Sequence, residues 1–124
     1  METKKIANQL SEIIKKASDS GFSVDPTATT FITEQCRKGK KHGSIVKMAD
    51  CAVAALALIA GGMEIAEEKN SNRIDIDDIK EGWSKKLGGT CPVYRCMRRT
   101  VFDKIGPLKD TMPYFKRLIE DIKE

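Results

Sequence analysis

The chain has few aromatic residues and few prolines, and it has no long apolar run. Phe, Trp and Tyr make up 6% of its 124 residues and Pro occurs 4 times, which argues against a sandwich or barrel of many short strands. The longest uncharged apolar stretch, residues 51–63, is shorter than the roughly 20 residues that a membrane-spanning helix needs. We therefore expect no membrane span and interpret this stretch as a buried helix.

The sequence also offers little for a leader peptide, a disulfide framework or a metal site. Residues 1–16 lack the apolar core of a secretory leader, which predicts a cytoplasmic or nucleoid-associated location with reduced thiols. Cys91 and Cys96 are separated by four residues, a poor spacing for structural zinc. A tetrahedral site would also need Cys36 and His42 from a different segment. We therefore expect neither a metal nor another cofactor.

The chain has enough hydrophobic and charged residues to form one compact domain. It is 40% hydrophobic and 32% charged, which is typical of an ordered chain, and its length predicts a single domain over residues 1–124. Lys and Arg number 22 against 18 for Asp and Glu, so the net charge is +4. This mildly basic balance suits contact with a polyanion such as nucleic acid.

Apolar residues recur every three or four positions along most of the chain, which predicts an all-α fold of about six helices. Gly21 should end the first helix, and Asp25 followed by Pro26 is typical of the start of the second. Asp77 or Asp78 should cap the fourth. The expected helices cover residues 3–17, 26–37, 44–69, 77–87, 90–105 and 111–122.

The longest expected helix, residues 44–69, carries an apolar seven-residue repeat and a glycine pair. Its inward positions follow one another in steps of four and three, so other helices or a partner chain should cover much of its circumference. Gly61 and Gly62 would cost about 2 kcal/mol relative to alanine in an exposed helix. We therefore expect either a kink at this point or a second backbone packed closely against it.

The order of elements over residues 26–87 resembles the histone fold. The resemblance is carried by the long amphipathic helix and by residues 73–79, RIDIDDI, which are similar to the second loop and the acidic third-helix start of that family. It implies a handshake dimer in which the first loop of one protomer meets the second loop of its partner, where DNA phosphate binds. The helical lids of AAA+ ATPases have a very similar motif after a long helix. The sequence has no Walker motif, so the alternative is a detached lid-like module.

The histone resemblance places the basic side chains of the two loops at DNA. Ammonium and guanidinium groups suit this role because they displace counterions from phosphate without reading the base sequence. We therefore expect a non-enzymatic, homodimeric DNA-binding or architectural protein that contacts the backbone of duplex DNA. Its candidate binding residues are Arg37, Lys38, Lys40, Lys41, Lys47, Lys69 and Arg73.

Three other interpretations stay open at this point. The basic run around Lys40 could be a solvated loop that only keeps the chain soluble. A helical adaptor would meet a protein partner through an apolar stripe at Leu56, Ile59 and Met63. A small enzyme would use Cys91 at a helix N-terminus, but no acid–base partner lies near it in the sequence. We therefore expect no catalytic residue.

Overall fold

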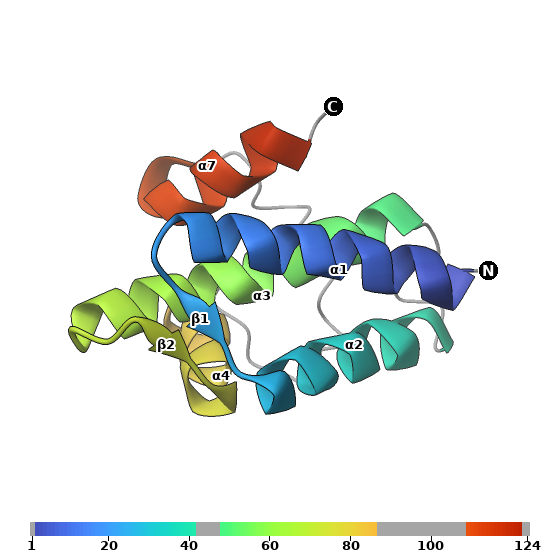
Figure 1. Cartoon of the computed structure of the whole chain (residues 1–124), viewed down its shortest axis with the longest axis horizontal. Coiled ribbons are helices and arrows are strands. Elements are labelled where there is room, and N and C mark those ends of the chain that lie inside the picture. The colour runs from blue at the N-terminus through green and yellow to red at the C-terminus, as the bar shows by residue number, and fades with distance from the viewer. Residues whose placement is uncertain (1, 42–47, 87–108, 123–124) are drawn as a thin grey trace.

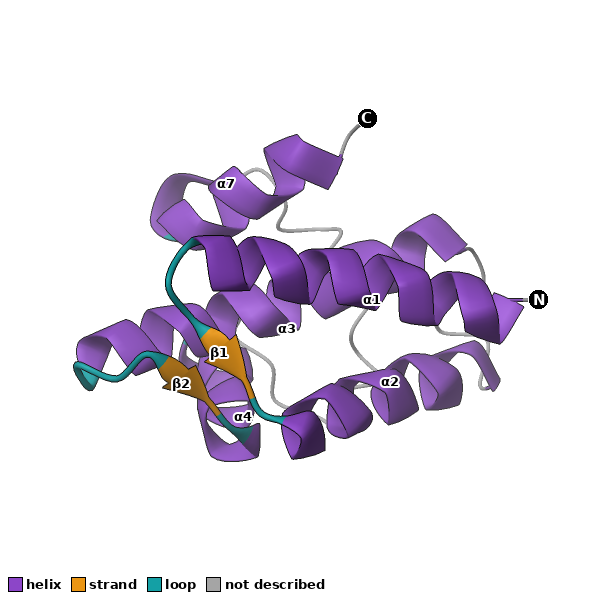
Figure 2. Cartoon of the chain, in the orientation of Figure 1, coloured by secondary structure: helices purple, strands orange, loops and turns teal. Residues whose placement is uncertain are grey.

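The computed structural model of the chain describes residues 2–41, 48–86 and 109–122 (Figure 1). An all-α fold is confirmed, and helices account for most of the described residues (Figure 2). The expected helix over residues 90–105 lies outside the described residues. The helices are α1 (Glu2–Asp19), α2 (Pro26–Lys41), α3 (Met48–Glu68), α4 (Ile76–Lys85) and α7 (Pro113–Ile122), and the strands are β1 (Ser23–Val24) and β2 (Arg73–Ile74).

The start of α2 is confirmed at Pro26, but its predicted end near Arg37 is wrong. The helix continues to Lys41, so four residues of the expected basic loop are helical. Gly39 does not stop the helix because a single glycine costs only about 1 kcal/mol relative to alanine. Packing of α2 against α3 outweighs this cost. Ser44, the expected cap of the long helix, lies outside the described residues.

The N-cap of α4 is Asp75, and the expectation of Asp77 or Asp78 is wrong. Asp75 has extended backbone angles because it directly follows β2, and its carboxylate accepts the backbone N–H of Asp78 at 2.9 Å. In return, the Asp78 carboxylate accepts the backbone N–H of Asp75 at 3.1 Å. The two aspartates therefore form a reciprocal capping box that fixes the first turn of α4.

The core surrounds α3, which α1, α2, α4 and α7 contact from different sides (Figure 1). Residues 54–63 of α3 are all buried, so other helices of the same chain cover its full circumference there. This confirms the covering that the seven-residue repeat predicts. The main buried side chains from the neighbouring elements are Leu10, Ile13, Ile32, Ile74, Ile79, Trp83, Phe115, Leu118 and Ile119.

The glycine pair of α3 lies against the backbone of α4. A Cβ atom built on Gly82 would be 2.5 Å from the carbonyl carbon and oxygen of Gly61. A Cβ atom on Gly62 would be 2.7 Å from Cγ2 of Ile74. Side chains at these positions would push the two helices apart, so glycine allows α4 and β2 to approach α3 closely. The expectation of a second backbone packed against the pair is confirmed.

A helix, a turn, a short strand and a second helix occur twice in the chain. The α1–β1–α2 and α3–β2–α4 units join through their strands, which pair in parallel with Ser23 opposite Arg73 and Val24 opposite Ile74 (Figure 2). The repeat is hard to see in the sequence because the only identical pair next to the strands is Asp25 and Asp75.

Both units also end their first helix with the same type of turn. The N–H of Phe22 donates to the carbonyl of Ala17 at 2.9 Å, and the N–H of Ser71 donates to the carbonyl of Ala66 at 2.8 Å. The residues before these donors, Gly21 and Asn70, have φ values of 94° and 56°. These features define a Schellman turn, in which glycine is the commonest left-handed residue and asparagine also occurs. The predicted role of Gly21 is confirmed.

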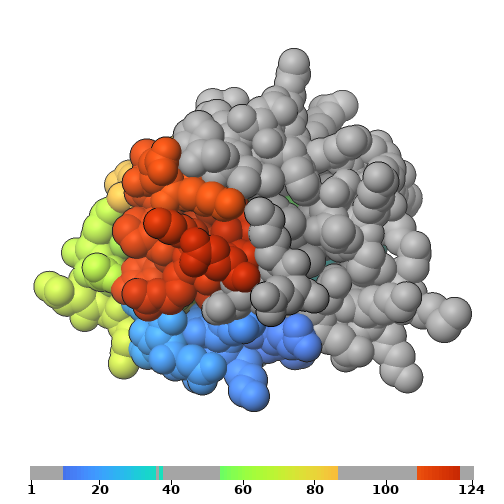
Figure 3. Space-filling view, turned by 90° about the horizontal axis from the view of Figure 1, so that it is seen from above, coloured from blue at the N-terminus to red at the C-terminus, as the bar shows by residue number. Residues whose placement is uncertain are grey.

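The α7 helix packs on α3 and α1 (Figure 3), and polar contacts of Tyr114 fix its first turn. The backbone N–H of Tyr114 donates to Glu64 Oε2 at 3.2 Å, while its hydroxyl donates to Glu67. The bond to the Glu67 carboxylate raises the pKa of Tyr114 to about 12. The Tyr114 ring also meets Phe22 edge to face, with ring centres 5.3 Å apart. Two carboxylates of α3 therefore set the position of α7.

The glycine contact gives a first testable prediction. We expect Gly82→Ala to lower the free energy of unfolding by about 1–3 kcal/mol, because overpacking outweighs the gain in helix propensity. Ser84→Ala, two residues away on the exposed face of α4, should have little effect. Urea unfolding followed by the emission of Trp83, the one tryptophan of the chain, measures both variants. A stabilised Gly82→Ala variant would contradict the proposed backbone contact.

A second prediction concerns the pH dependence of stability. Burial raises the pKa of Glu64 above its ordinary value, and this outweighs the lowering effect of its bond to the Tyr114 N–H. The folded state therefore holds this proton more tightly, and the contribution of Glu64 to stability falls as pH rises through the folded pKa. We expect Glu64→Gln to be more favourable relative to wild type at pH 7 than at pH 4 in urea unfolding. Glu12→Gln on the exposed face of α1 controls for the lost charge.

Candidate nucleic-acid interface

The first cluster of predicted DNA-binding residues lies at the C-terminal end of α2. Arg37 is exposed, and the described residues contain no ion-pair partner for it. Lys38, Lys40 and Lys41 belong to the same helical end, although the described side chains do not include theirs. Lys47 lies outside the described residues. The structure therefore brings four of the seven predicted residues together in the last turns of one helix.

This helical end is one of two segments of the chain with a net charge of +3, the other being residues 87–108, which lie outside the described residues. The α2 sequence contains four cations and one carboxylate, Glu34, for a net charge of +3. The whole chain has a net charge of +4. Among the described residues, α2 is therefore the most basic element, and positions 37, 40 and 41 share one face of the helix.

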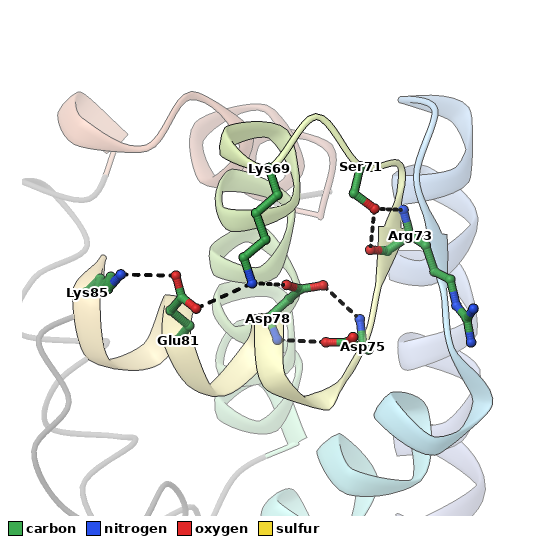
Figure 4. Close-up of polar contacts among 7 residues, drawn as sticks. All are labelled: Lys69, Ser71, Arg73, Asp75, Asp78, Glu81 and Lys85. Atoms are coloured by element: carbon green, nitrogen blue, oxygen red, sulfur yellow. Dashed lines mark hydrogen bonds and ion pairs between the residues drawn. The ribbon is translucent and has the colours of Figure 1, made fainter.

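The second cluster begins with Lys69, whose ammonium group is already paired with carboxylates of α4 (Figure 4). Its Nζ lies 3.1 Å from Asp78 Oδ1 and 3.4 Å from Glu81 Oε1. The hydrogen bond to Asp78 is the main reason that the pKa of Lys69 is raised. Lys85 approaches the other oxygen of Glu81 at 3.1 Å, and this bond lowers the pKa of Glu81. A phosphate group would have to compete with these carboxylates for Lys69.

Arg73 is likewise bound within the chain. Its Nε and Nη2 atoms donate to the two carboxylate oxygens of Asp25 at 2.5 and 3.0 Å. This two-point contact raises the pKa of Arg73. The Arg73 side chain is 71% exposed, so the pair lies at the surface and phosphate could reach the guanidinium only in competition with Asp25.

The two basic clusters lie near opposite ends of α3 (Figure 1). The end of α2 is near the start of α3, whereas Lys69 and Arg73 follow its last residue. A helix of 21 residues is about 30 Å long, so a single phosphate group cannot bridge the clusters. Within the described residues, Arg37 at the end of α2 has no ion-pair partner, whereas Lys69 and Arg73 at the other end are paired internally.

Two features bear on the handshake dimer that the histone resemblance implies. The β2 strand of the second loop already pairs with β1 of the same chain. The central part of α3, which would cross its counterpart in the partner, is buried by helices of its own chain. Both surfaces that such a dimer would use are therefore occupied within the described residues, and dimerisation stays a prediction of the resemblance.

The sequence interpretation missed the carboxylates that pair with the second cluster. Asp25 was assigned only to capping α2, and its pairing with Arg73 joins residues 48 positions apart. A single sequence does not show which residues of β1 and β2 lie opposite each other, and this register brings Asp25 to Arg73. Asp78 and Glu81 carry a clearer signal, because they fall one turn apart on the next helix along the chain after Lys69. Acidic residues that close to a predicted phosphate ligand could have indicated an internal ion pair.

Several other candidates fall outside what the structure describes. His42, Cys91 and Cys96 are not among the described residues, and the side chain of Cys36 is not described either. Among the described side chains, no three His, Cys, Asp or Glu residues lie close enough to hold a metal ion. The described residues therefore do not test the zinc site or the cysteine-dependent enzyme.

The capping box supplies a third prediction. We expect Asp75→Ala to lower the free energy of unfolding by about 1 kcal/mol, because it leaves the N–H of Asp78 without its acceptor. Asp77→Ala removes the same charge from an exposed position in the first turn and should cost clearly less. Urea unfolding of both variants provides the comparison. Equal losses would mean that charge at the start of α4, rather than the cap, provides the stability.

Comparisons with known proteins were made for the full chain. No protein family, curated protein or solved structure matches it. In the part of the chain that the structure describes, no helix is both long enough and apolar enough to cross a membrane. Any assignment of function therefore depends on the charge distribution and the contacts described above.

Proposed function

We propose that the chain is a non-enzymatic protein that binds the phosphate backbone of duplex DNA through the basic C-terminal end of α2. The observation that supports this proposal is the excess of cations in α2. The α2 helix contains four cations and one carboxylate. Arg37 is exposed and has no ion-pair partner among the described residues. The proposal keeps Arg37, Lys38, Lys40 and Lys41 as the binding residues.

The opposite end of the molecule gives much less support for phosphate binding. Residues 67–86 contain six carboxylates and five cations, for a net charge of −1. Lys69 and Arg73 are among these cations, and both already have carboxylate partners. The cations of these pairs are exposed but Asp25 and Asp78 are largely buried, so phosphate could reach the cations only in competition with these carboxylates, which makes contact less favourable than at α2.

The proposed mode of binding does not require a dimer. A cluster of three or four cations neutralises an equal number of phosphates and releases their counterions, which gives salt-dependent affinity without base recognition. The homodimer, nucleoid association and histone-like architecture remain further proposals from the sequence resemblance.

The adaptor interpretation loses the docking surface that the sequence suggested for it. Leu56, Ile59 and Met63 have no exposed surface in the folded chain, so a partner could not reach this stripe without unfolding the core. An adaptor role would need a different face.

The experiment is a titration of a fluorescent 20-base-pair duplex followed by anisotropy at 50 and 200 mM salt. We expect wild-type binding to weaken with salt, and we expect the triple variant Lys38→Glu, Lys40→Glu and Lys41→Glu to lose roughly two orders of magnitude in affinity at low salt. The variant Arg37→Glu tests the residue whose exposure is described. Light scattering of the same mixtures gives the number of 13.8 kDa chains per duplex.

The control is a second triple variant with the same change in net charge, Lys15→Glu, Lys80→Glu and Lys116→Glu. These lysines are exposed on α1, α4 and α7, away from the end of α2. Circular dichroism checks that α2 stays helical, because basic residues also stabilise a helix C-terminus through its dipole. An absence of wild-type binding at 50 mM salt, or equal losses in the two triple variants, would reject the proposal.

A further inference from the structure

A polar hollow of about 610 Å³ lies where the two Schellman turns and α7 meet. It is open to solvent, and its lining comes from three segments that are far apart in the sequence. None of its described lining residues is basic, and Glu67 is the one charged group among them. The polar side chains around it are Ser20, Glu67, Asn70, Ser71, Asn72 and Tyr114.

The ends of α1 and α3 both contribute to this hollow, since Gly21 and Asn70 line it. The Schellman turns satisfy several of the last carbonyl groups, but each helix C-terminus still carries the negative end of the helix dipole. The hollow therefore receives negative potential from two helices at once. A Cβ atom built on Gly21 would have no neighbouring atom within 4 Å, so the space beside that turn is open.

The charge at the end of α3 is the reverse of what a helix C-terminus favours. Its last turn holds no basic residue, and Glu67 and Glu68 are there instead. Lys69 follows directly, but its ammonium group pairs with Asp78 and Glu81 of α4 and does not line the hollow. A carboxylate at the negative end of a helix is unfavourable, so this site gains from a bound positive charge.

The neighbouring groups leave Glu67 able to accept from a ligand. The Tyr114 hydroxyl donates one bond to its carboxylate, which has acceptor sites for several more. Arg117 is the nearest described cation of α7, and its guanidinium lies 5.6 Å from the centre of the Tyr114 ring. It does not line the hollow. Glu68 forms its ion pair elsewhere, with Lys86.

We propose that this hollow binds a guanidinium or primary ammonium group, with Glu67 as its counter-charge and the side-chain amide oxygens of Asn70 and Asn72 as further acceptors. The ligand class is an organic cation, presented either by a basic peptide or by a free polyamine. This site lies at the opposite end of α3 from the basic end of α2, so it is independent of the proposed phosphate contact.

The test is a titration of the ¹⁵N-labelled chain with N-acetylarginine methylamide, followed by amide chemical shifts. We expect shift changes concentrated at residues 20–22 and 70–72. The citrulline analogue, which has the same shape but no charge, should give none. Spermidine and an arginine-containing peptide are titrated in parallel, and the tighter of the two identifies the source of the cation. Changes of equal size with the citrulline analogue, or changes spread over the whole surface, would overturn the proposal.

Two matched variants test whether the Glu67 carboxylate is the counter-charge of the bound cation. Glu67→Gln keeps an acceptor for the Tyr114 hydroxyl and should weaken binding about tenfold, because it removes a charge-assisted hydrogen bond. Glu68→Gln changes the same charge one residue away, outside the hollow, and should bind as wild type does. The unbound spectra show that both variants are folded. Equal affinity of Glu67→Gln and wild type would refute the role of Glu67 and with it the proposed site.

Discussion

The close contact between Gly61 of α3 and Gly82 of α4 is the constraint on which the arrangement of the second half of the fold depends. It allows the backbones of the two helices to meet without intervening side chains. The contact holds α4 against the second half of α3, and Lys69, which follows α3, pairs with Asp78 and Glu81 of the same α4 helix.

Charged residues are distributed unevenly over the described part of the molecule. Cations gather at the end of α2, whereas the far end of α3 combines paired cations with the polar hollow around Glu67. The proposed phosphate contact and the proposed cation site thus lie at opposite ends of one helix.

The helices and their buried faces could be predicted from sequence, because apolar spacing and boundary residues such as Gly21 and Pro26 act locally. Ile79, Trp83, Phe115 and Leu118 are buried as their spacing predicts. The pairing of Arg73 with Asp25 could not, because it depends on the register of two strands nearly fifty residues apart. The end of α2 could not be predicted either, because the cost of Gly39 within the helix is offset by packing of α2 on α3.

The pairing of β1 with β2 also has a consequence for how the chain folds. Each strand has two residues, too few to hold together on hydrogen bonds alone. Their meeting closes a loop of about fifty residues, whose entropy cost must be offset by contacts already made. Helices close in sequence can pack before that happens. We therefore expect the small sheet to form late in folding. By then the helical core has assembled, and pairing of the strands joins its two repeated units.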